Sequence, residues 1–339
     1  MIELQDNSLV FSFPEVHEAA VLRIDFERTL RIPDDDDNYC LPPGLGKFPI
    51  YHVDDYAGKV PEKWIEHGGV MFPMYQAEAM WINFRVQTDA NIAVKYPFAV
   101  KIATGKINAV TGDLWSEGLH DNPQDYVVVP EQPWLDGYCV EKGVIRQFVA
   151  MPLGSGYSVE EQITDEAEYG GLQLQVYPLK REAFERRYPE PPESRESMSD
   201  ENIQMVRESA MSFAAGGQMK QEVYEAPYNL SDWDGDYNSR CFVHIANSML
   251  WGEYTGENPP TTPPTAKEYT QENLPWFDWY DEKNQVLSGA ENLANVKSVA
   301  QLGKEKDETP LPENKSVTPQ RVIRLRKGLK PDQVREWSD

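Results

Sequence analysis

The chain has 339 residues, and 56 Asp and Glu against 32 Lys and Arg give it a formal net charge of −24 at pH 7. A charge of this sign repels nucleic acid and anionic lipid, so neither is an expected partner. No apolar run approaches the roughly 20 residues of a membrane-spanning helix, and the N-terminal residues do not follow a signal-peptide pattern. We therefore expect a soluble cytoplasmic protein of one or two domains.

The first half of the chain reads mainly as β-structure. Residues 8–32 alternate apolar and polar side chains, and residues 98–112 have the pattern of a hairpin that turns at Gly105. Further strands are expected around Val128, Phe148 and Leu174, where Val, Ile, Phe and Tyr are enriched. Two short helices are predicted, one over 61–67 and one over 75–84.

The second half is more mixed. Residues 188–199 are rich in proline and charge and predict a linker. A helix is expected over 200–213, ended by Gly216 and Gly217, and strands over 219–225 and 240–247. Residues 257–265 predict polyproline II. Capping-box patterns predict a helix after Thr265 and another from Ser288 to about Leu302.

These elements predict a β-rich α+β fold, with an antiparallel sheet or sandwich as the core and a smaller mixed α/β region packed on it. The expected division is a β-rich core domain at 1–188, a mixed region at 199–310 and a basic C-terminal segment at 311–339. The linker becomes a surface loop if the first two ranges share one core.

Two cations inside apolar strands are the weak catalytic candidates. Lys101 and Arg146 each interrupt such a run, and a buried cation is costly unless it is paired. Asp125, Asp136 and Glu160 lie on nearby turns as partners, and Asp136 joins the two cations as a candidate. One interpretation is an anion-recognising or acid–base pocket; the other is that the cations point outward from a one-sided sheet.

A possible divalent-cation loop follows at Asp232, Asp234 and Asp236, where oxygen ligands alternate. The glycine and glutamate positions of a helix–loop–helix calcium site do not match, so a solvated turn is the competing interpretation. The three cysteines, Cys40, Cys139 and Cys241, are odd in number and far apart, which argues against a disulfide framework or a zinc site. For Cys241 and His244, the strand pattern favours a buried thiol beside a hydrogen-bonded imidazole over a catalytic pair.

Aromatic residues give a third set of candidates. Trp134, Trp276 and Trp279, together with Trp251, have the chemistry to stack on a flat ligand or a sugar, although core and inter-domain packing is the more frequent explanation of such residues. Residues 315–330 carry six positive charges and no acid. This pattern predicts an edge strand that docks on acidic surface of the same chain, or on an acidic partner.

Several strings resemble a family of bacterial hypothetical proteins with no assigned function. They include FPMYQAEAMWINF, KIATGKINAVTG, PQDYVVVPEQPWLDG, IRQFVAMPLGSGY, GGLQLQVYP and SRCFVHIANS. The resemblance runs nearly end to end and implies one integrated architecture. It carries over no catalytic residue and no cofactor.

The leading functional hypothesis is a non-catalytic ligand-binding or protein-interaction scaffold, whose partner is an unidentified protein or small molecule. The first alternative is a hydrolase or lyase that uses carboxylates near Lys101 and Arg146. The second is a divalent-cation protein that uses Asp232, Asp234 and Asp236.

Overall fold

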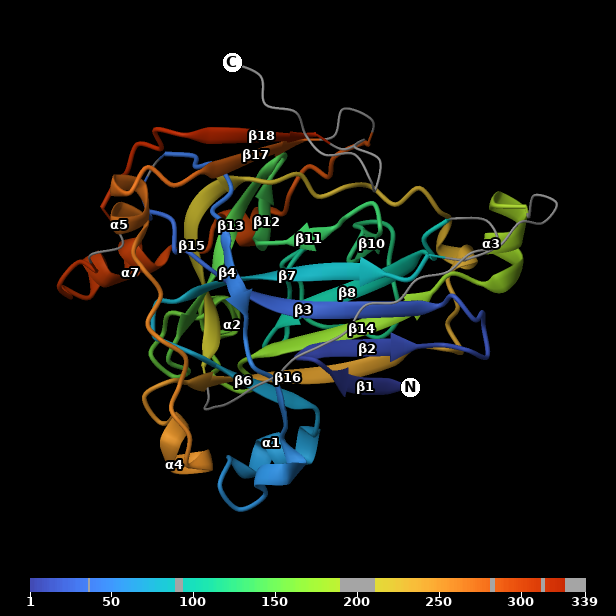
Figure 1. The fold of residues 1–339 in the computed structure, drawn as a ribbon, viewed down its shortest axis with the longest axis horizontal. Helices are drawn as coiled ribbons and strands as arrows, with labels where there is room; N and C mark the ends of the chain where they lie inside the picture. The colour runs from blue at the N-terminus through green and yellow to red at the C-terminus, as the bar shows by residue number, and fades with distance from the viewer. Residues whose placement is uncertain (36, 89–93, 190–210, 281–283, 312–314, 327–339) are drawn as a thin grey trace.

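The computed structural model describes residues 1–35, 37–88, 94–189, 211–280, 284–311 and 315–326, with only the backbone of 279, 280 and 324–326. In this part of the chain two β-sheets pack face to face, and the helices lie around their edges (Figure 1). The fold is therefore β-rich α+β, as the sequence predicts.

The first sheet contains nine strands within the described residues. Their order is β1-β2-β3-β7-β13-β12, with β4 on β3, β11 on β7 and β15 on β13, and every strand pair is antiparallel. The strands are β1 Ile2–Gln5, β2 Ser8–Ser12, β3 Val21–Thr29, β4 Gly44–Lys47, β7 Ala79–Val86, β11 Trp134–Leu135, β12 Gly137–Glu141, β13 Val144–Met151 and β15 Ser212–Lys220.

The second sheet has seven described strands in the order β10-β8-β14-β16-β6-β5, with β9 on β8. Its β16–β6 pair is parallel and its other pairs are antiparallel. The strands are β5 Tyr51–His52, β6 Val70–Met74, β8 Phe98–Thr104, β9 Ile107–Asn108, β10 Val127–Val129, β14 Leu172–Pro178 and β16 Ser239–Asn247.

A separate parallel pair joins β17, Trp276–Tyr280, to β18, Val322–Arg326. This confirms a strand in the basic segment, while residues 327–330 of that segment lie outside the described part. The helices are short, and none in the described chain is long and apolar enough to cross a membrane. They are η1 Asp54–Tyr56, α1 Glu62–His67, α2 Val159–Thr164, α3 Arg181–Arg187, η2 Leu230–Asp232, α4 Trp251–Thr255, α5 Ala266–Gln271, α6 Glu291–Ala294 and α7 Val299–Glu305.

Alternation along the strands builds the core between the sheets. Leu22, Ile24 and Phe26 of β3 are fully buried, and the Phe26 ring lies 5.0 Å from that of Phe72 on β6. The same hydrophobic cluster includes residues of β15 and β16. Described residues on both sides of the 190–210 gap therefore contribute to one hydrophobic cluster.

The helix predicted over 75–84 is wrong, because Ala79–Val86 forms β7. This strand pairs with β3 along its whole length and with β13 at Ala79 and Met80. The helix-forming Ala, Glu and Met residues of the segment are thus overridden by pairing on two sides.

The second half of the chain also differs from the predicted structure. Most of the predicted linker and of the predicted 200–213 helix falls in residues 190–210, which lie outside the described part. Ser212 and Phe213 are the first residues of β15, not the last turn of a helix. Gly216 and Gly217 lie inside that strand, where a Cβ on Gly217 would stand 2.1 Å from the Pro33 carbonyl oxygen.

Of the two helices predicted from capping-box patterns, one is confirmed and the other is wrong. Thr265 caps α5 through Glu268, as predicted. The helix expected from Ser288 to Leu302 is two helices, α6 and α7, and the side-chain cap belongs to Ser298 at the start of α7.

Candidate functional site

The Lys101 side chain is the centre of a buried polar cluster. Its neighbours Val100 and Ile102 belong to the core, so alternation along β8 places Lys101 on the opposite face of the sheet. There the segment 109–126, which joins β9 to β10, closes over it, and only 1% of the side chain is exposed. Within this enclosure the cost of burying the ammonium group has to be met by its partners.

Four oxygen atoms surround the Lys101 ammonium. Nζ lies 2.6 Å from Asp125 Oδ2 and donates to the carbonyl oxygens of Ser116 and Gly118, each at 2.7 Å. The Ser116 hydroxyl is 3.3 Å away, and the Trp115 ring centre lies 5.2 Å from Nζ. The three N–H donors are thus engaged, so Lys101 is a group that positions the loop and not a free nucleophile.

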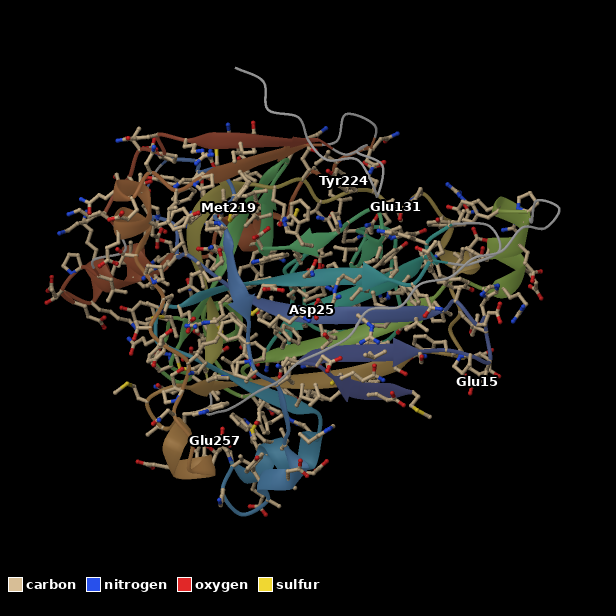
Figure 2. The ribbon with its side chains drawn as sticks, in the orientation of Figure 1. Glu15, Asp25, Glu131, Met219, Tyr224 and Glu257 are labelled. Atoms are coloured by element: carbon tan, nitrogen blue, oxygen red, sulfur yellow. The ribbon has the colours of Figure 1, made fainter. Side chains whose placement is uncertain are left out.

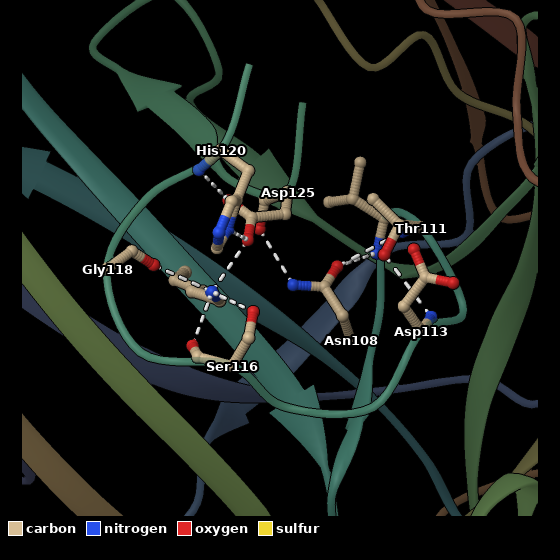
Figure 3. Close-up of polar contacts among 9 residues, drawn as sticks. Asn108, Thr111, Asp113, Ser116, Gly118, His120 and Asp125 are labelled. Atoms are coloured by element: carbon tan, nitrogen blue, oxygen red, sulfur yellow. Dashed lines mark hydrogen bonds and ion pairs between the residues drawn. The ribbon is translucent and has the colours of Figure 1, made fainter. Parts of the chain in front are cut away.

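Asp125 connects this ammonium to His120. Its Oδ1 accepts a hydrogen bond from the His120 backbone N–H at 2.9 Å, and its Oδ2 lies 2.9 Å from His120 Nδ1 (Figure 3). The carboxylate is 9% exposed, whereas 52% of the imidazole side chain is exposed. A buried carboxylate therefore holds one end of a histidine whose other end faces outward.

Asn108 fixes the base of the same loop. Its side-chain amide donates to the Asp125 carbonyl oxygen at 2.8 Å, and its Oδ1 accepts from the N–H groups of Val110 and Thr111 at 2.8 and 3.1 Å. The Thr111 hydroxyl in turn accepts from Asp113 N at 3.2 Å (Figure 3). The loop is consequently ordered by side-chain contacts at both of its ends.

Two cavities adjoin this loop. A cavity of about 210 Å³ is lined by Lys101, Ser116, His120 and Asp125 among others, and a larger one of about 710 Å³ lies beside it. They share a set of wall residues: Thr111, Asp113, Asn122 and Pro123. His120 therefore stands next to the larger cavity.

The larger cavity is acidic. Four carboxylates line it, and none of its described lining residues is basic; the four are Asp113, Asp121, Glu225 and Glu291. Among the described residues none of these carboxylates forms an ion pair. Gln124 joins two of the walls, because its amide group donates to the Tyr224 carbonyl oxygen at 3.1 Å and accepts from Ala226 N at 2.7 Å.

The candidates Lys101, Asp136 and Arg146 do not gather in one place. Lys101 belongs to the second sheet and meets Asp125, while Arg146 lies on β13 of the first sheet, opposite Tyr138 and Gln218. Asp136 is buried between β11 and β12, where its Oδ2 accepts from Gln221 Nε2 at 2.7 Å. Burial raises the pKa of Asp136 to about 7.

The aspartates of the predicted cation loop are engaged in local contacts. Asp232 pairs with Arg186 at 2.8 Å and accepts from the Asn229 backbone and side chain. Asp234 Oδ1 accepts from Asp236 N and Tyr237 N, each at 3.0 Å. In the described residues no group of three or more His, Cys, Asp or Glu is arranged to hold a metal ion. The cation site at Asp232, Asp234 and Asp236 stays a prediction.

The predicted aromatic candidates are distributed differently. Trp276 is fully buried and its indole N–H donates to Thr270 Oγ1 at 3.2 Å, so its ring is not open to a ligand. Trp134 is half-buried, with its ring edge-on to that of Trp81. The Trp279 side chain lies outside the described part.

The region of Cys241 and His244 is a strand, β16, as predicted. Cys241 is buried in the core cluster, and His244 is buried on the opposite face with Nε2 3.0 Å from the Gly68 carbonyl oxygen. Burial lowers the pKa of His244 to about 4.

His120 is absent from the residues that the sequence pointed to. The available signal was its position five residues before Asp125, in the loop that follows the Lys101 hairpin. Comparison of the chain with protein-family models, with curated proteins and with solved structures finds no match. What the protein binds is therefore inferred from the geometry of the site.

Proposed function

We propose that the protein binds a small organic cation in the cavity beside the 109–126 loop. The carrying observation is the combination of volume and charge. About 710 Å³ falls inside the roughly 300–1,000 Å³ that is usual for small-molecule sites. Four carboxylates line this space without a described cation to neutralise them.

Electrostatics supports a cation over an anion. The carboxylates stand in a concave surface of a chain with net charge −24, and such a surface concentrates positively charged solutes. Each of the four carboxylates is exposed, so they keep their hydration until a ligand arrives. Amide side chains such as Asn122 and Asn292 add hydrogen-bonding groups to the same walls.

The framework behind the cavity supports a preformed site. Gln124 ties the loop to the 224–226 segment, and Asn292 Nδ2 donates to Asp113 Oδ1 at 3.3 Å from α6. Segments far apart in sequence therefore meet around the cavity through side-chain contacts. A preformed site loses less conformational entropy on binding.

The test is thermal unfolding with millimolar putrescine, spermidine, choline or arginine, and with glucose as a neutral comparator. A ligand at about 100 times its Kd stabilises the native state by about 2.7 kcal/mol, which raises Tm by several degrees. We expect a saturable rise with at least one organic cation and none with glucose.

A charge-matched pair of variants locates the effect. Asp121→Asn with Glu291→Gln is expected to abolish the rise in Tm, while Glu15→Gln with Glu62→Gln, which removes two exposed charges elsewhere, is expected to keep it. Glu15 lies in the turn that joins β2 to β3 (Figure 2) and is not among the residues that line the cavity. A rise that survives the cavity variant, or no rise with any cation, contradicts the proposal.

The two alternative functions remain predictions with less support. A hydrolase or lyase at Lys101 and Arg146 would need these cations to act together, and they lie on different sheets. A divalent-cation protein would show a higher Tm in millimolar calcium than in chelator, and Asp234→Asn would remove that difference.

A further inference from the structure

We propose that His120 Nε2 accepts a hydrogen bond from a hydroxyl group of the ligand in the adjacent cavity. The inference rests on the proposed function, since the ligand is the cation bound there, and it narrows the class to hydroxyl-bearing organic cations. Three properties of the cluster support it: the ionisation of Asp125, the tautomer of His120 and the surroundings of His120 Nε2.

Asp125 is an acceptor at both oxygens. Oδ2 lies 2.6 Å from the buried Lys101 ammonium, and Oδ1 accepts from the His120 backbone N–H. A carboxylate that pairs with an ammonium at this distance is ionised, and an ionised carboxylate has no proton to donate.

The tautomer of His120 follows from this. Because Asp125 Oδ2 can only accept, the proton in the 2.9 Å contact belongs to His120 Nδ1. In the neutral imidazole the other nitrogen, Nε2, then carries the lone pair. A second bond, from the backbone N–H of the same histidine, fixes the position of the residue as well as its ring (Figure 3).

Nε2 is available to a ligand. It makes no hydrogen bond to the described residues, and 52% of the side chain is exposed. His120 lines the smaller cavity, which shares Asn122 and Pro123 with the acidic one. A cation in the acidic cavity that carries a hydroxyl group on a short arm would bring the O–H to this nitrogen.

In the complex the ligand hydroxyl group keeps its proton and donates it in a hydrogen bond to the Nε2 lone pair. The Asp125 carboxylate accepts from Nδ1–H on the other side of the ring, which makes Nε2 a stronger acceptor. Lys101 acts as a positioning residue, because it holds Asp125 and its own donors are engaged.

The first measurement is made on the wild-type protein, because Asp125 variants risk misfolding. Long-range ¹H–¹⁵N correlation spectra of the imidazole rings report the tautomer directly. We expect His120 to be protonated at Nδ1 at neutral pH. A His120 protonated at Nε2, or one that exchanges between both tautomers, overturns the inference.

The second measurement is the rate of modification by diethyl pyrocarbonate, followed by peptide mass spectrometry. The reagent transfers an ethoxycarbonyl group to the lone-pair nitrogen and releases carbon dioxide and ethanol. Exposed His52, which has no carboxylate partner among the described residues, is the internal reference. We expect His120 to react about tenfold faster, the effect of a charge-assisted hydrogen bond on the developing imidazolium. Equal rates overturn the inference.

Variants and ligands separate this inference from the proposed function. Asp125→Asn is expected to remove the excess rate of His120, whereas Asp54→Asn, an exposed control, keeps it. Choline is expected to protect His120 from modification more than ethyltrimethylammonium, which lacks the hydroxyl group. A fast His120 that no cation protects rejects the proposed ligand class and keeps Nε2 as a hydrogen-bond acceptor; equal protection by both compounds rejects the role of the hydroxyl group.

Discussion

Two buried aspartates, Asp25 on β3 and Asp125 before β10, are stabilised by different kinds of partner. Asp25 lies on the outer face of the first sheet, where Lys47 at 2.8 Å, Arg85 at 2.7 Å and the side chains of Ser8 and Asn83 all donate to it (Figure 2). Asp125 has a single ammonium partner, Lys101, and an imidazole.

The two networks differ in whether one of the partner side chains can still exchange a proton or bind a ligand. The donors around Asp25 are permanent cations and neutral polar groups, which lose no proton near neutral pH. At Asp125 one donor is a histidine that lines a cavity and is 52% exposed. Buried carboxylates are therefore a weak sign of function in this chain, and a titratable partner beside a cavity is the distinguishing sign.

The largest effect is expected for Lys101→Met. The variant leaves Asp125 buried without its cation and two carbonyl oxygens without their donor, so the free energy of unfolding falls by about 3–5 kcal/mol. Urea unfolding at pH 7 measures it. The control is Lys106→Met, on the same hairpin as Lys101, which removes an ion pair to exposed Glu166. Its expected cost is about 1 kcal/mol or less. A loss of about 1 kcal/mol or less in both variants would show that the enclosed Lys101 ammonium group does not stabilise the fold.

Asp136→Asn extends the comparison to a buried carboxyl without a cation. With its pKa raised to about 7, the folded protein binds a proton that the unfolded chain loses near pH 4, so this group lowers stability as pH rises from about 4 to 7. The Asn variant is expected to gain roughly 2–4 kcal/mol relative to the wild type across that window. Urea unfolding at pH 5 and pH 8 tests the gain, with Asp54→Asn as the exposed control. A difference that does not change with pH would mean that Asp136 ionises normally.

His244 provides the matching comparison for His120, since it meets a carbonyl group instead of a carboxylate. Its pKa of about 4 means that the unfolded chain takes up a proton below pH 6.5 before the folded protein does, so stability falls as pH drops from 6.5 to 4. The contribution is at most about 3 kcal/mol. His244→Gln should flatten this part of the curve of unfolding free energy against pH, whereas exposed His52→Gln should not. An unchanged slope in the first variant assigns the acid sensitivity to other groups.

The smallest effect is expected for Lys47→Met beside Asp25. Lys47 is 31% exposed and Arg85 remains on the carboxylate, so the free energy of unfolding should fall by about 0.2–1 kcal/mol. A cost near that of Lys101→Met would remove the distinction between the two aspartate networks. The same urea titrations decide it.

Much of the fold could be predicted because its local signals agree with its tertiary contacts. The alternation in β3, the Gly105 hairpin and the Thr265 cap each specify a structure that the surrounding chain accepts. The helix predicted over 75–84 is wrong because the composition of the segment favours a helix, while β3 and β13 offer it strand edges on both sides. The sequence pattern places Gly216 and Gly217 at a helix end, but they are required where β15 passes close to Val149 and Pro33.

The candidate site was only partly predictable. Lys101 in an apolar run correctly signalled a buried charge, and Asp125 was one of the partners named for it. Arg146 gave the same signal from the other sheet, because a sequence pattern does not tell which sheet a strand joins. The contact between His120 and Asp125 depends on the path of the loop over β8, which has no periodic signal to reveal it.

The parallel β16–β6 pair has a consequence for synthesis. It joins residues 70–74 to residues 243–247, so among the described strands β6 has only β5 as a partner until the chain has grown past residue 247. On the ribosome this edge of β6 therefore stays unpaired while residues 75–247 are made. Contacts of such long sequence separation also slow folding, and a newly made chain released early would present that edge to other chains.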